Sequence, residues 1–180
     1  MAKSKSEKGS APANVQYAAL PWRVGEDGKL QILLITTRRT RRWIIPKGAP
    51  IKGMTAARAA AQEAFEEAGV RGQTLEKPFG SFRFRKTLEG APDVVCLVKV
   101  FLLQVKTQLR FWPESRQRDV VWVEPRQACA LVGDEGLRLL IARFASKAAP
   151  KGQRGKKARL EILSAAGAEP QTPSAQTEIG

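Results

Sequence analysis

Three glutamates, Glu63, Glu66 and Glu67, lie at positions i, i+3 and i+4 within a run of strong helix formers. This spacing places all three carboxylates on one face of a helix, within about one turn of one another. Like charges this close repel each other, so the cluster is either a solvated acidic face or a binding site for a divalent cation. Mg²⁺ and Mn²⁺ require oxygen ligands of this kind, and a bound ion would replace the repulsion with coordination.

The chain around this acidic cluster is strongly basic. Its 180 residues include 31 Lys and Arg against 17 Asp and Glu, which gives a formal net charge of +14 at pH 7. This charge predicts attraction to polyanions, among them phosphorylated small molecules and nucleic acid. The sequence contains no histidine, which excludes a Ser-His triad, a His-ligated metal and phosphohistidine chemistry. Any catalysis therefore depends on carboxylates, Lys, Tyr, Cys or a metal held by oxygen.

The glutamates are expected on a helix over residues 56–68. Thr55 is a suitable N-cap, alanine is frequent in the run, and Gly69 is typical of a helix end. The small alanines let such a helix pack closely on a sheet. The expected strands are 15–24, 30–37, 43–45, 80–86, 94–105 and 120–123, and two later helices are expected over 125–132 and 134–146. This order predicts an α+β fold in which a mixed β-sheet lies between helices.

One folded domain is expected, over residues 15–146. Residues 1–14 and 147–180 are polar and rich in small residues, so we expect disordered tails there. The stretch 147–159 carries six basic residues and no acid. It either binds nucleic acid or another polyanion weakly, or it only keeps the chain in solution.

No membrane contact is expected. The N-terminal residues lack the apolar region of a signal peptide, and the apolar stretch 93–105 is too short and too interrupted to cross a bilayer. Cys96 and Cys129 are far apart in apolar surroundings, which favours two buried free thiols in a reducing compartment over a disulfide. Together these observations predict a cytoplasmic protein.

The glutamates also belong to a longer pattern. Counted from Gly48, the chain resembles the Nudix box G-x5-E-x7-R-E-U-x-E-E-x-G-U, in which U is a bulky aliphatic residue. The matching positions are Gly48, Glu63, Glu66, Glu67, Gly69 and Val70. Three positions depart, since Met54 replaces the first Glu, Gln62 replaces the Arg, and Ala64 is smaller than the usual residue. The lead-in over residues 42–48 looks like that of the diphosphoinositol polyphosphate phosphohydrolases and their bacterial relatives.

The resemblance implies a Nudix fold, an α/β/α sandwich, and hydrolysis of a pyrophosphate bond with Mg²⁺ or Mn²⁺. By this likeness, Glu63 and Glu67 ligate the ion, and Glu66 is a further ligand or the base that activates water. The family also uses a backbone carbonyl near the opening glycine, which here belongs to Lys47 or Gly48.

Arginines flank the box on both sides. Arginine forks suit phosphate oxygens, and in the inositol-pyrophosphate branch the residues that match Thr37 and Arg38 contact substrate phosphates. Any one of these cations alone is typical of a solvated surface, but as a set beside the box they favour phosphate binding. The expected substrate-binding residues are Thr37, Arg38, Arg39, Arg42, Lys47, Gly48, Arg85, Lys86 and Arg118. Glu114 and Asp119 are candidates for additional carboxylates.

The expected substrate is a phosphorylated small molecule, of the diphosphoinositol polyphosphate or dinucleoside polyphosphate type. Two alternatives stay open at this point. One is a nucleoside triphosphate or ADP-ribose pyrophosphatase. The other is a non-catalytic nucleic-acid-binding protein for which this fold is only a scaffold, although the sequence lacks the interleaved aromatic and basic residues that base stacking uses.

Overall fold

The computed structural model describes residues 14–88 and 91–148, and the side chains of residues 86–88 and 91–93 fall outside that description. The expected tails, 1–14 and 147–180, therefore lie almost entirely outside the described residues, as does most of the basic stretch 147–159. The polyanion binding expected of that stretch stays a prediction.

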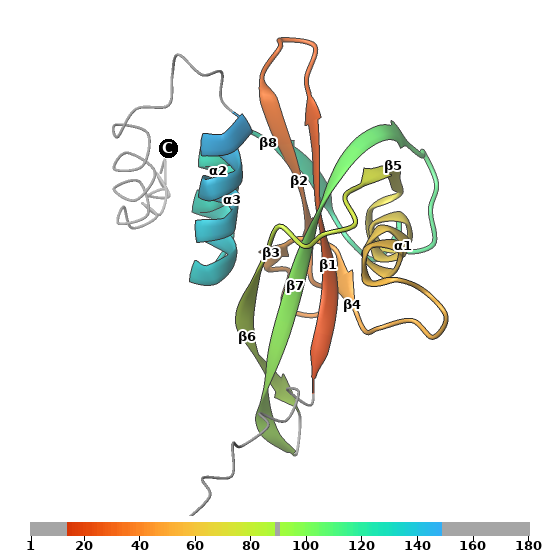
Figure 1. The fold of residues 1–180 in the computed structure, drawn as a ribbon, viewed down its shortest axis with the longest axis vertical. Helices are drawn as coiled ribbons and strands as arrows, with labels where there is room; N and C mark the ends of the chain where they lie inside the picture. The colour runs from red at the N-terminus through yellow and green to blue at the C-terminus, as the bar shows by residue number, and fades with distance from the viewer. Residues whose placement is uncertain (1–13, 89–90, 149–180) are drawn as a thin grey trace, which may run out of the picture.

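The described chain forms one mixed sheet of eight strands (Figure 1). The strands are β1 (Val15–Val24), β2 (Leu30–Thr36), β3 (Trp43–Ile44), β4 (Lys47–Gly48), β5 (Val70–Thr74), β6 (Gly80–Leu88), β7 (Ala91–Gln108) and β8 (Val120–Val123). The order β3-β2-β1-β7-β5 runs across the sheet, while β4 pairs with β1, β6 with β7, and β8 with β2. The β1–β7 pairing is parallel and the others are antiparallel, which makes the sheet mixed, as expected.

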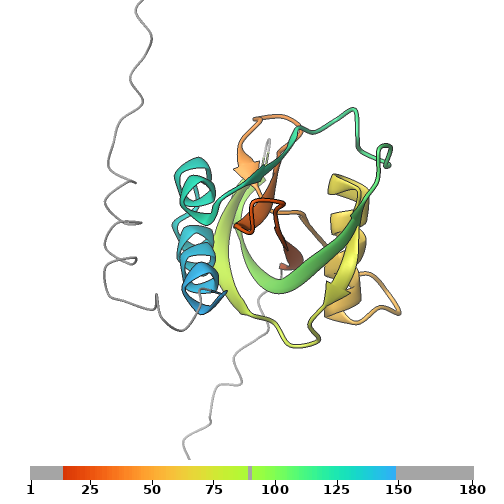
Figure 2. The ribbon, with the colours of Figure 1, turned by 90° about the horizontal axis from the view of Figure 1, so that it is seen from above.

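Helices cover both faces of this sheet. The helix α1 (Ala56–Ala68) lies on one face, while α2 (Pro125–Leu131) and α3 (Glu135–Ala148) lie together on the other (Figure 2). Successive strand residues point to opposite faces, so the strands contribute side chains to two hydrophobic cores, one on each face of the sheet. Ala18, Ile32 and Val100 pack with the α2 and α3 residues, whereas Ala19 and Leu33 pack with the alanines of α1. The result is the α/β/α sandwich that the sequence predicted.

The boundaries of α1 follow from its caps. The Thr55 side chain accepts a hydrogen bond from the Arg58 backbone N–H at 3.3 Å. At the other end Gly69 adopts the left-handed region with φ 68°, which costs glycine little because it has no β-carbon. The predicted helix is confirmed at both ends. Its buried face is built from alanines, so α1 approaches the sheet closely.

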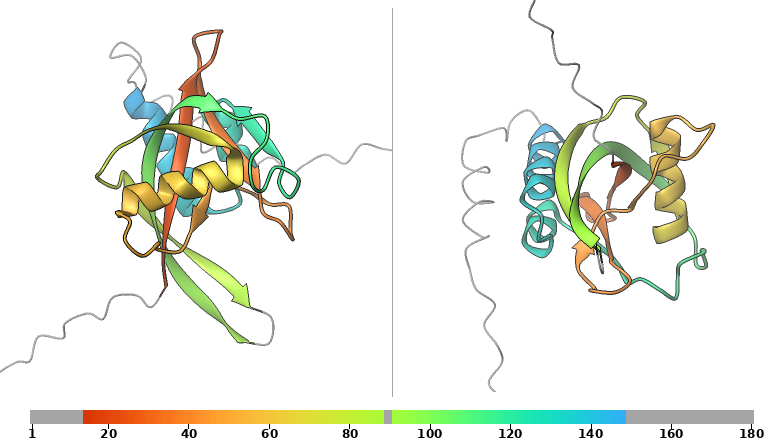
Figure 3. Two further views of the ribbon diagram at one scale, coloured as in Figure 1. Left: turned by 90° about the vertical axis from the view of Figure 1, so that its right-hand side faces the viewer. Right: turned by 90° about the horizontal axis from the view of Figure 1, so that it is seen from below.

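Two short strands were not anticipated. The strand β4 has two residues, and β5 follows Gly69 directly with mostly exposed residues. Neither shows the alternation of apolar and polar residues by which a strand is recognised. The central strand is longer than expected, and β6 and β7 run on together past the rest of the sheet (Figure 3). The last helix extends two residues beyond the expected end at residue 146.

Two smaller expectations concern cysteine and the membrane. Cys96 and Cys129 are both buried and free, as predicted. Among the described residues, none of the helices is long and apolar enough to span a membrane.

Close packing of α1 gives a first test. Ala64 is fully buried between the helix and the sheet, so Ala64→Leu should overpack this core and lower the free energy of unfolding by about 1–3 kcal/mol. The half-buried Ala61 faces a groove on the same helix, and Ala61→Leu is the matched control with a smaller expected loss. Chemical denaturation of both variants measures the difference. Equal stability of the two would contradict close packing at Ala64.

Candidate active site

The three glutamates of α1 differ in their surroundings. Glu67 is 7% exposed, whereas Glu63 and Glu66 are half-buried. The strand β4 passes directly beside Glu63, because a β-carbon built on Gly48 would collide with the Glu63 carboxylate. Gly48 pairs with Tyr17 of β1, so the sheet fixes this close approach. The glycine that opens the sequence pattern is therefore needed to admit a glutamate of the same pattern.

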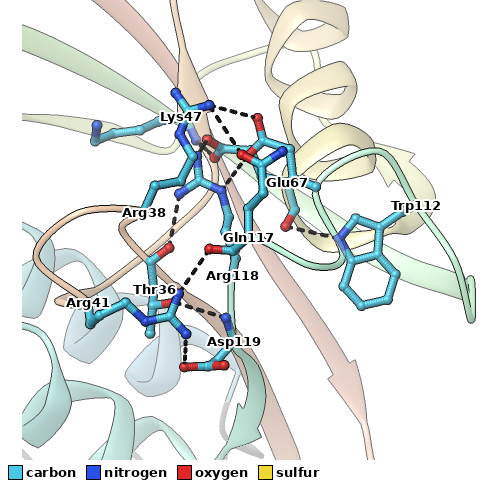
Figure 4. Close-up of polar contacts among 10 residues, drawn as sticks. Thr36, Arg38, Arg41, Lys47, Glu67, Trp112, Gln117, Arg118 and Asp119 are labelled. Atoms are coloured by element: carbon cyan, nitrogen blue, oxygen red, sulfur yellow. Dashed lines mark hydrogen bonds and ion pairs between the residues drawn. The ribbon is translucent and has the colours of Figure 1, made fainter.

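The Glu67 carboxylate is held on both oxygens. The Lys47 backbone N–H donates to Oε2 at 2.9 Å, and the Arg118 guanidinium forms an ion pair with Oε1 (Figure 4). The Trp112 indole donates to the backbone carbonyl of Glu67 at 3.3 Å. The side chain of Arg118 is 6% exposed and that of Glu67 is 9% exposed. The pair is therefore a buried one, and screening by water is weak.

Arg118 makes two further contacts. Its Nε donates to Oε2 of Glu114 at 2.5 Å, and its Nη1 donates to the backbone carbonyl of Thr36 at 2.9 Å. One guanidinium thus joins α1, the end of β2 and the segment between β7 and β8. Only the planar fork of arginine offers donors in these several directions.

Glu66 has a different set of partners. Gln62, one turn earlier on α1, donates from its side-chain amide to Oε1 of Glu66 at 2.5 Å. The backbone carbonyl of Glu66 accepts from the Glu114 backbone N–H at 3.1 Å. The segment that carries Glu114 and Arg118 is therefore fastened to the end of α1 by backbone as well as side-chain bonds.

The clustering changes the protonation of two carboxyls. Burial, with smaller contributions from Glu67, Glu66 and Glu114, raises the pKa of Glu63 to about 7. Burial also raises the pKa of Glu67, although Arg118 and the Lys47 backbone N–H oppose the increase. Burial and the neighbouring carboxylates therefore disfavour a full set of charged glutamates at this site.

A basic loop joins β2 to β3 beside the glutamates. The Thr37 side chain accepts from the Arg42 backbone N–H at 3.0 Å and closes the loop. Arg41 adopts a positive φ of 52°, which is strained for a residue with a β-carbon. It is held there by an ion pair with Asp119 and a 2.9 Å bond to the Gln117 carbonyl. Its neighbours in the loop are thereby presented to solvent.

Arg38 is a loop arginine whose contacts reach toward the glutamates. Its Nη1 lies 3.6 Å from Oε1 of Glu114 and 3.5 Å from the side-chain oxygen of Gln117. The side chain of Arg38 is 59% exposed, so these contacts are weak ones. Arg39 and Arg42 are exposed in the same loop.

The remaining predicted residues divide between the two faces of the sheet. Phe82 and Phe84 of β6 pack on the α2 and α3 side, so by alternation Arg85 is exposed on the face that α1 covers. The Lys47 ammonium lies 4.6 Å from the Phe84 ring centroid, and the Lys47 backbone N–H donates to Glu67. The side chain of Lys86 lies outside the described residues.

The structure thus brings most of the predicted residues together and leaves others apart. The assembled group is Glu63, Glu66, Glu67, Gly48, Arg38, Arg118, Glu114 and the backbone of Lys47. Asp119 pairs with Arg41 at the far end of the loop and does not join the carboxylates. Sequence reasoning missed Trp112, which packs on Gly69. The contact between an indole and the glycine that ends a helix produces no periodic pattern in the sequence, so Trp112 could not be predicted from spacing.

The glutamates as they stand do not enclose an ion. In the part of the chain that the structure describes, no group of three or more acidic or cysteine residues is arranged to hold a metal. Both oxygens of Glu67 are engaged by Lys47 and Arg118, and one oxygen of Glu66 is engaged by Gln62. The donor chemistry nevertheless fits Mg²⁺ or Mn²⁺, since three hard carboxylates share one helix face. Each carboxylate oxygen can accept more than one partner, so these contacts leave lone pairs for a cation.

Comparison with known proteins gives a family match over residues 16–144, to the NUDIX domain. The chain is 32% identical over 131 residues to Nudix hydrolase 13, mitochondrial, of Arabidopsis thaliana, which covers 70% of this chain and 65% of that protein. It is 31% identical over 119 residues to Nudix hydrolase 12, mitochondrial, of the same plant, with 64% and 59% covered. The chain spans less than two thirds of the length of these curated relatives.

Solved structures share the fold at low sequence identity. An Ap4A hydrolase from C. elegans aligns with a TM-score of 0.56 and 19% identity, over 76% of this chain and 98% of that one. The NUDIX domain of Shewanella oneidensis NrtR, complexed with ADP ribose, aligns with a TM-score of 0.60 and 11% identity, over 81% and 94%. These likenesses establish the architecture.

The raised pKa of Glu63 predicts a pH-dependent stability. Because the folded pKa is above the usual value, the stability that Glu63 contributes is present below that value and is lost as the pH rises to about 7. Glu63→Gln removes this loss. In the presence of a chelator, its Tm relative to the unsubstituted protein should therefore increase between about pH 5 and about pH 8.

Exposed Glu76 supplies the control for net charge. Glu76→Gln should show a Tm difference that stays flat over the same pH range. If Glu63→Gln followed the flat line of the control, the carboxylate clustering described above would be wrong.

Proposed function

Since the chain belongs to the NUDIX domain family, we propose that it is a divalent-metal-dependent hydrolase that cleaves the pyrophosphate bond of a phosphorylated small molecule. The observation that carries the proposal is the carboxylate cluster of α1. Three glutamates share one face, Gly48 admits Glu63 against β4, and Glu67 is buried and held on both oxygens. A solvated acidic stripe would need none of these arrangements.

The mechanism assigns each glutamate a task. Glu63 and Glu67 would hold Mg²⁺ or Mn²⁺, which would neutralise phosphate charge and activate water. Glu66 is half-buried and receives one hydrogen bond, from Gln62 to Oε1, so its other oxygen remains available to accept the proton of the attacking water. The backbone of Gly48 passes beside Glu63, and the carbonyl oxygen of Lys47 or of Gly48 would be a further ligand, as in the family that the chain resembles.

The basic loop between β2 and β3 binds the phosphates of the substrate. Arg38 reaches toward the carboxylate cluster, while Arg39 and Arg42 extend the positive surface outward. Guanidinium groups bind phosphate oxygens in pairs, and the net charge of +14 draws polyanions to the protein. This charge favours a substrate with many phosphates, of the diphosphoinositol polyphosphate or dinucleoside polyphosphate type, over one with a single pyrophosphate.

A substrate panel tests the proposal directly. The full chain is incubated with diphosphoinositol polyphosphate, diadenosine tetraphosphate, ADP-ribose and nucleoside triphosphates, each with Mg²⁺, with Mn²⁺ and with chelator. Release of phosphate or of a phosphorylated fragment is measured. We expect metal-dependent cleavage that is fastest on the most highly phosphorylated compounds. Metal-independent cleavage, or no cleavage across the panel, would contradict the proposal.

The glutamates are tested on the preferred substrate of that panel. Glu63→Gln and Glu66→Gln should each lower kcat on the order of 100-fold or more, because several kcal/mol of transition-state stabilisation is lost. Glu135 lies at the start of α3 on the opposite face of the sheet and is exposed, so Glu135→Gln should keep full activity. Thermal unfolding checks that each variant is folded. If the Glu63→Gln and Glu66→Gln variants turned over substrate about as fast as the control, these two glutamates would have no role in the reaction.

The loop arginine makes a separate prediction about binding. Arg38→Ala should raise KM for a highly phosphorylated substrate roughly tenfold while kcat changes little, because a charge-assisted hydrogen bond to substrate is lost. Arg126 is exposed on α2, away from the carboxylates, and Arg126→Ala controls for net charge. Steady-state kinetics at constant ionic strength decide the point. An equal rise of KM in both variants would show general attraction and no phosphate site at Arg38.

A further inference from the structure

A groove borders α1 outside the carboxylate cluster. It is open to solvent, lies between α1 and β5, and has a volume of about 380 Å³, which is within the roughly 300–1,000 Å³ of small-molecule sites. None of the three glutamates lines it, so the groove is distinct from the cluster. The lining residues are Met54, Arg58, Ala61, Gln62, Phe65, Val70, Arg71, Gly72 and Leu103.

The groove carries two cations and no acid. Arg58 comes from α1 and Arg71 from β5, and both are exposed. Among the described residues, neither forms an ion pair with a carboxylate. Arg58 also stands in the first turn of α1, where the helix dipole favours an anion and disfavours a cation. Two guanidinium groups without a counter-charge in one groove suit an anionic ligand, and phosphate in particular.

The rest of the groove is mainly apolar, and one of its cations is held against an aromatic ring. Met54, Val70 and Leu103 contribute apolar surface. The Arg71 guanidinium carbon lies 4.4 Å from the centroid of the Phe65 ring, and this cation–π contact holds Arg71 in place. Guanidinium planes also stack on the planar rings of ligands. The groove therefore offers a stacking partner for a ring as well as a charge for a phosphate.

Two lining residues depart from the Nudix box. Met54 stands where the pattern has glutamate, and Gln62 stands where it has arginine. With Met54 in that place, the groove has no carboxylate of its own to neutralise Arg58 or Arg71. The Gln62 amide donates to Glu66 at 2.5 Å and has a second N–H with which it can bind a ligand. The affinity of the groove for anions thus depends on a residue in which this chain differs from the pattern.

The two arginines are anchored at separate points along the groove. Phe65 follows Arg58 on α1 by about two turns, or about 10 Å along the helix axis, and Arg71 lies over Phe65. This arrangement suits a ligand that has a phosphate at one end and a planar ring at the other.

We propose that the groove is a binding site for a nucleoside monophosphate, with the phosphate on Arg58 and Gln62 and the planar ring stacked on Arg71. The bound phosphate supplies the negative charge that the first turn of α1 and the two guanidinium groups lack. The site goes beyond the proposed hydrolysis, because it binds its ligand outside the carboxylate cluster and without a divalent cation.

Isothermal titration calorimetry of the full chain with AMP, in chelator and at constant ionic strength, tests the site. Adenosine and inorganic phosphate serve as the two halves of the ligand. AMP should bind at least about tenfold more tightly than either half, because it engages both ends of the groove at once. No binding of AMP, or equal binding by one of the halves, would overturn the proposal.

Substitutions locate the ligand. Arg58→Gln and Arg71→Gln should each weaken AMP binding roughly tenfold, because a charge-assisted hydrogen bond or a stacking partner is lost. Arg126 is exposed on α2, and Arg126→Gln, with the same change of net charge, should bind AMP as the unsubstituted protein does. Arg38→Ala in the basic loop should also retain binding. If Arg38→Ala lost AMP binding while Arg58→Gln retained it, AMP would occupy the basic loop, and the groove site would be wrong.

Position 54 offers a test that adds a charge. Met54 is 38% exposed, so its variants should fold. Met54→Glu should weaken AMP binding roughly threefold or more by repelling the phosphate, whereas the neutral Met54→Gln should not. Equal affinities of the two variants would contradict a phosphate in this groove. These titrations need neither metal nor turnover, so loss of this site leaves the proposed hydrolysis standing, and a failed substrate panel leaves this site standing.

Discussion

The burial of the Glu67 carboxylate is the constraint on which the site depends. Removing a carboxylate from water costs several kcal/mol unless hydrogen bonds and an opposite charge compensate. Here the compensation comes from the Lys47 backbone and from Arg118, which are distant in sequence from Glu67 and from each other. One buried charge therefore ties β4, α1 and the segment after β7 into a single arrangement. The other two glutamates are positioned because they share the helix with Glu67.

The sheet makes this convergence feasible. Parallel pairing of β1 with β7 and antiparallel pairing of β1 with β4 bring the backbone of Gly48 under α1. Fully buried alanines, among them Ala60 and Ala64, let the helix come close enough for Glu63 to meet that backbone. Larger residues on this face would lift the carboxylates away from β4. The small size of the alanine side chain therefore helps to place the acidic cluster against β4.

Local features of the site were predictable from the sequence, and long-range ones were not. The helix, its Thr55 and Gly69 caps and the shared face of the glutamates follow from spacing alone. The partner of Glu67 does not, because Arg118 is one of many arginines and lies 51 residues away. The set of cations beside the box placed Arg118 at the site, with substrate as its expected partner. Only the packed structure shows which cations are buried with the carboxylates.

Arg38 and Arg118 differ in burial, and this difference suits them to different roles. The contacts of Arg38 to Glu114 and Gln117 are long and exposed, so an arriving phosphate can replace them at little cost. The contacts of Arg118 are short, buried and shared among three partners, and a phosphate would have to displace carboxylates from a poorly screened site. The exposed arginine is therefore suited to a ligand that must leave, and the buried one to holding the carboxylates in place.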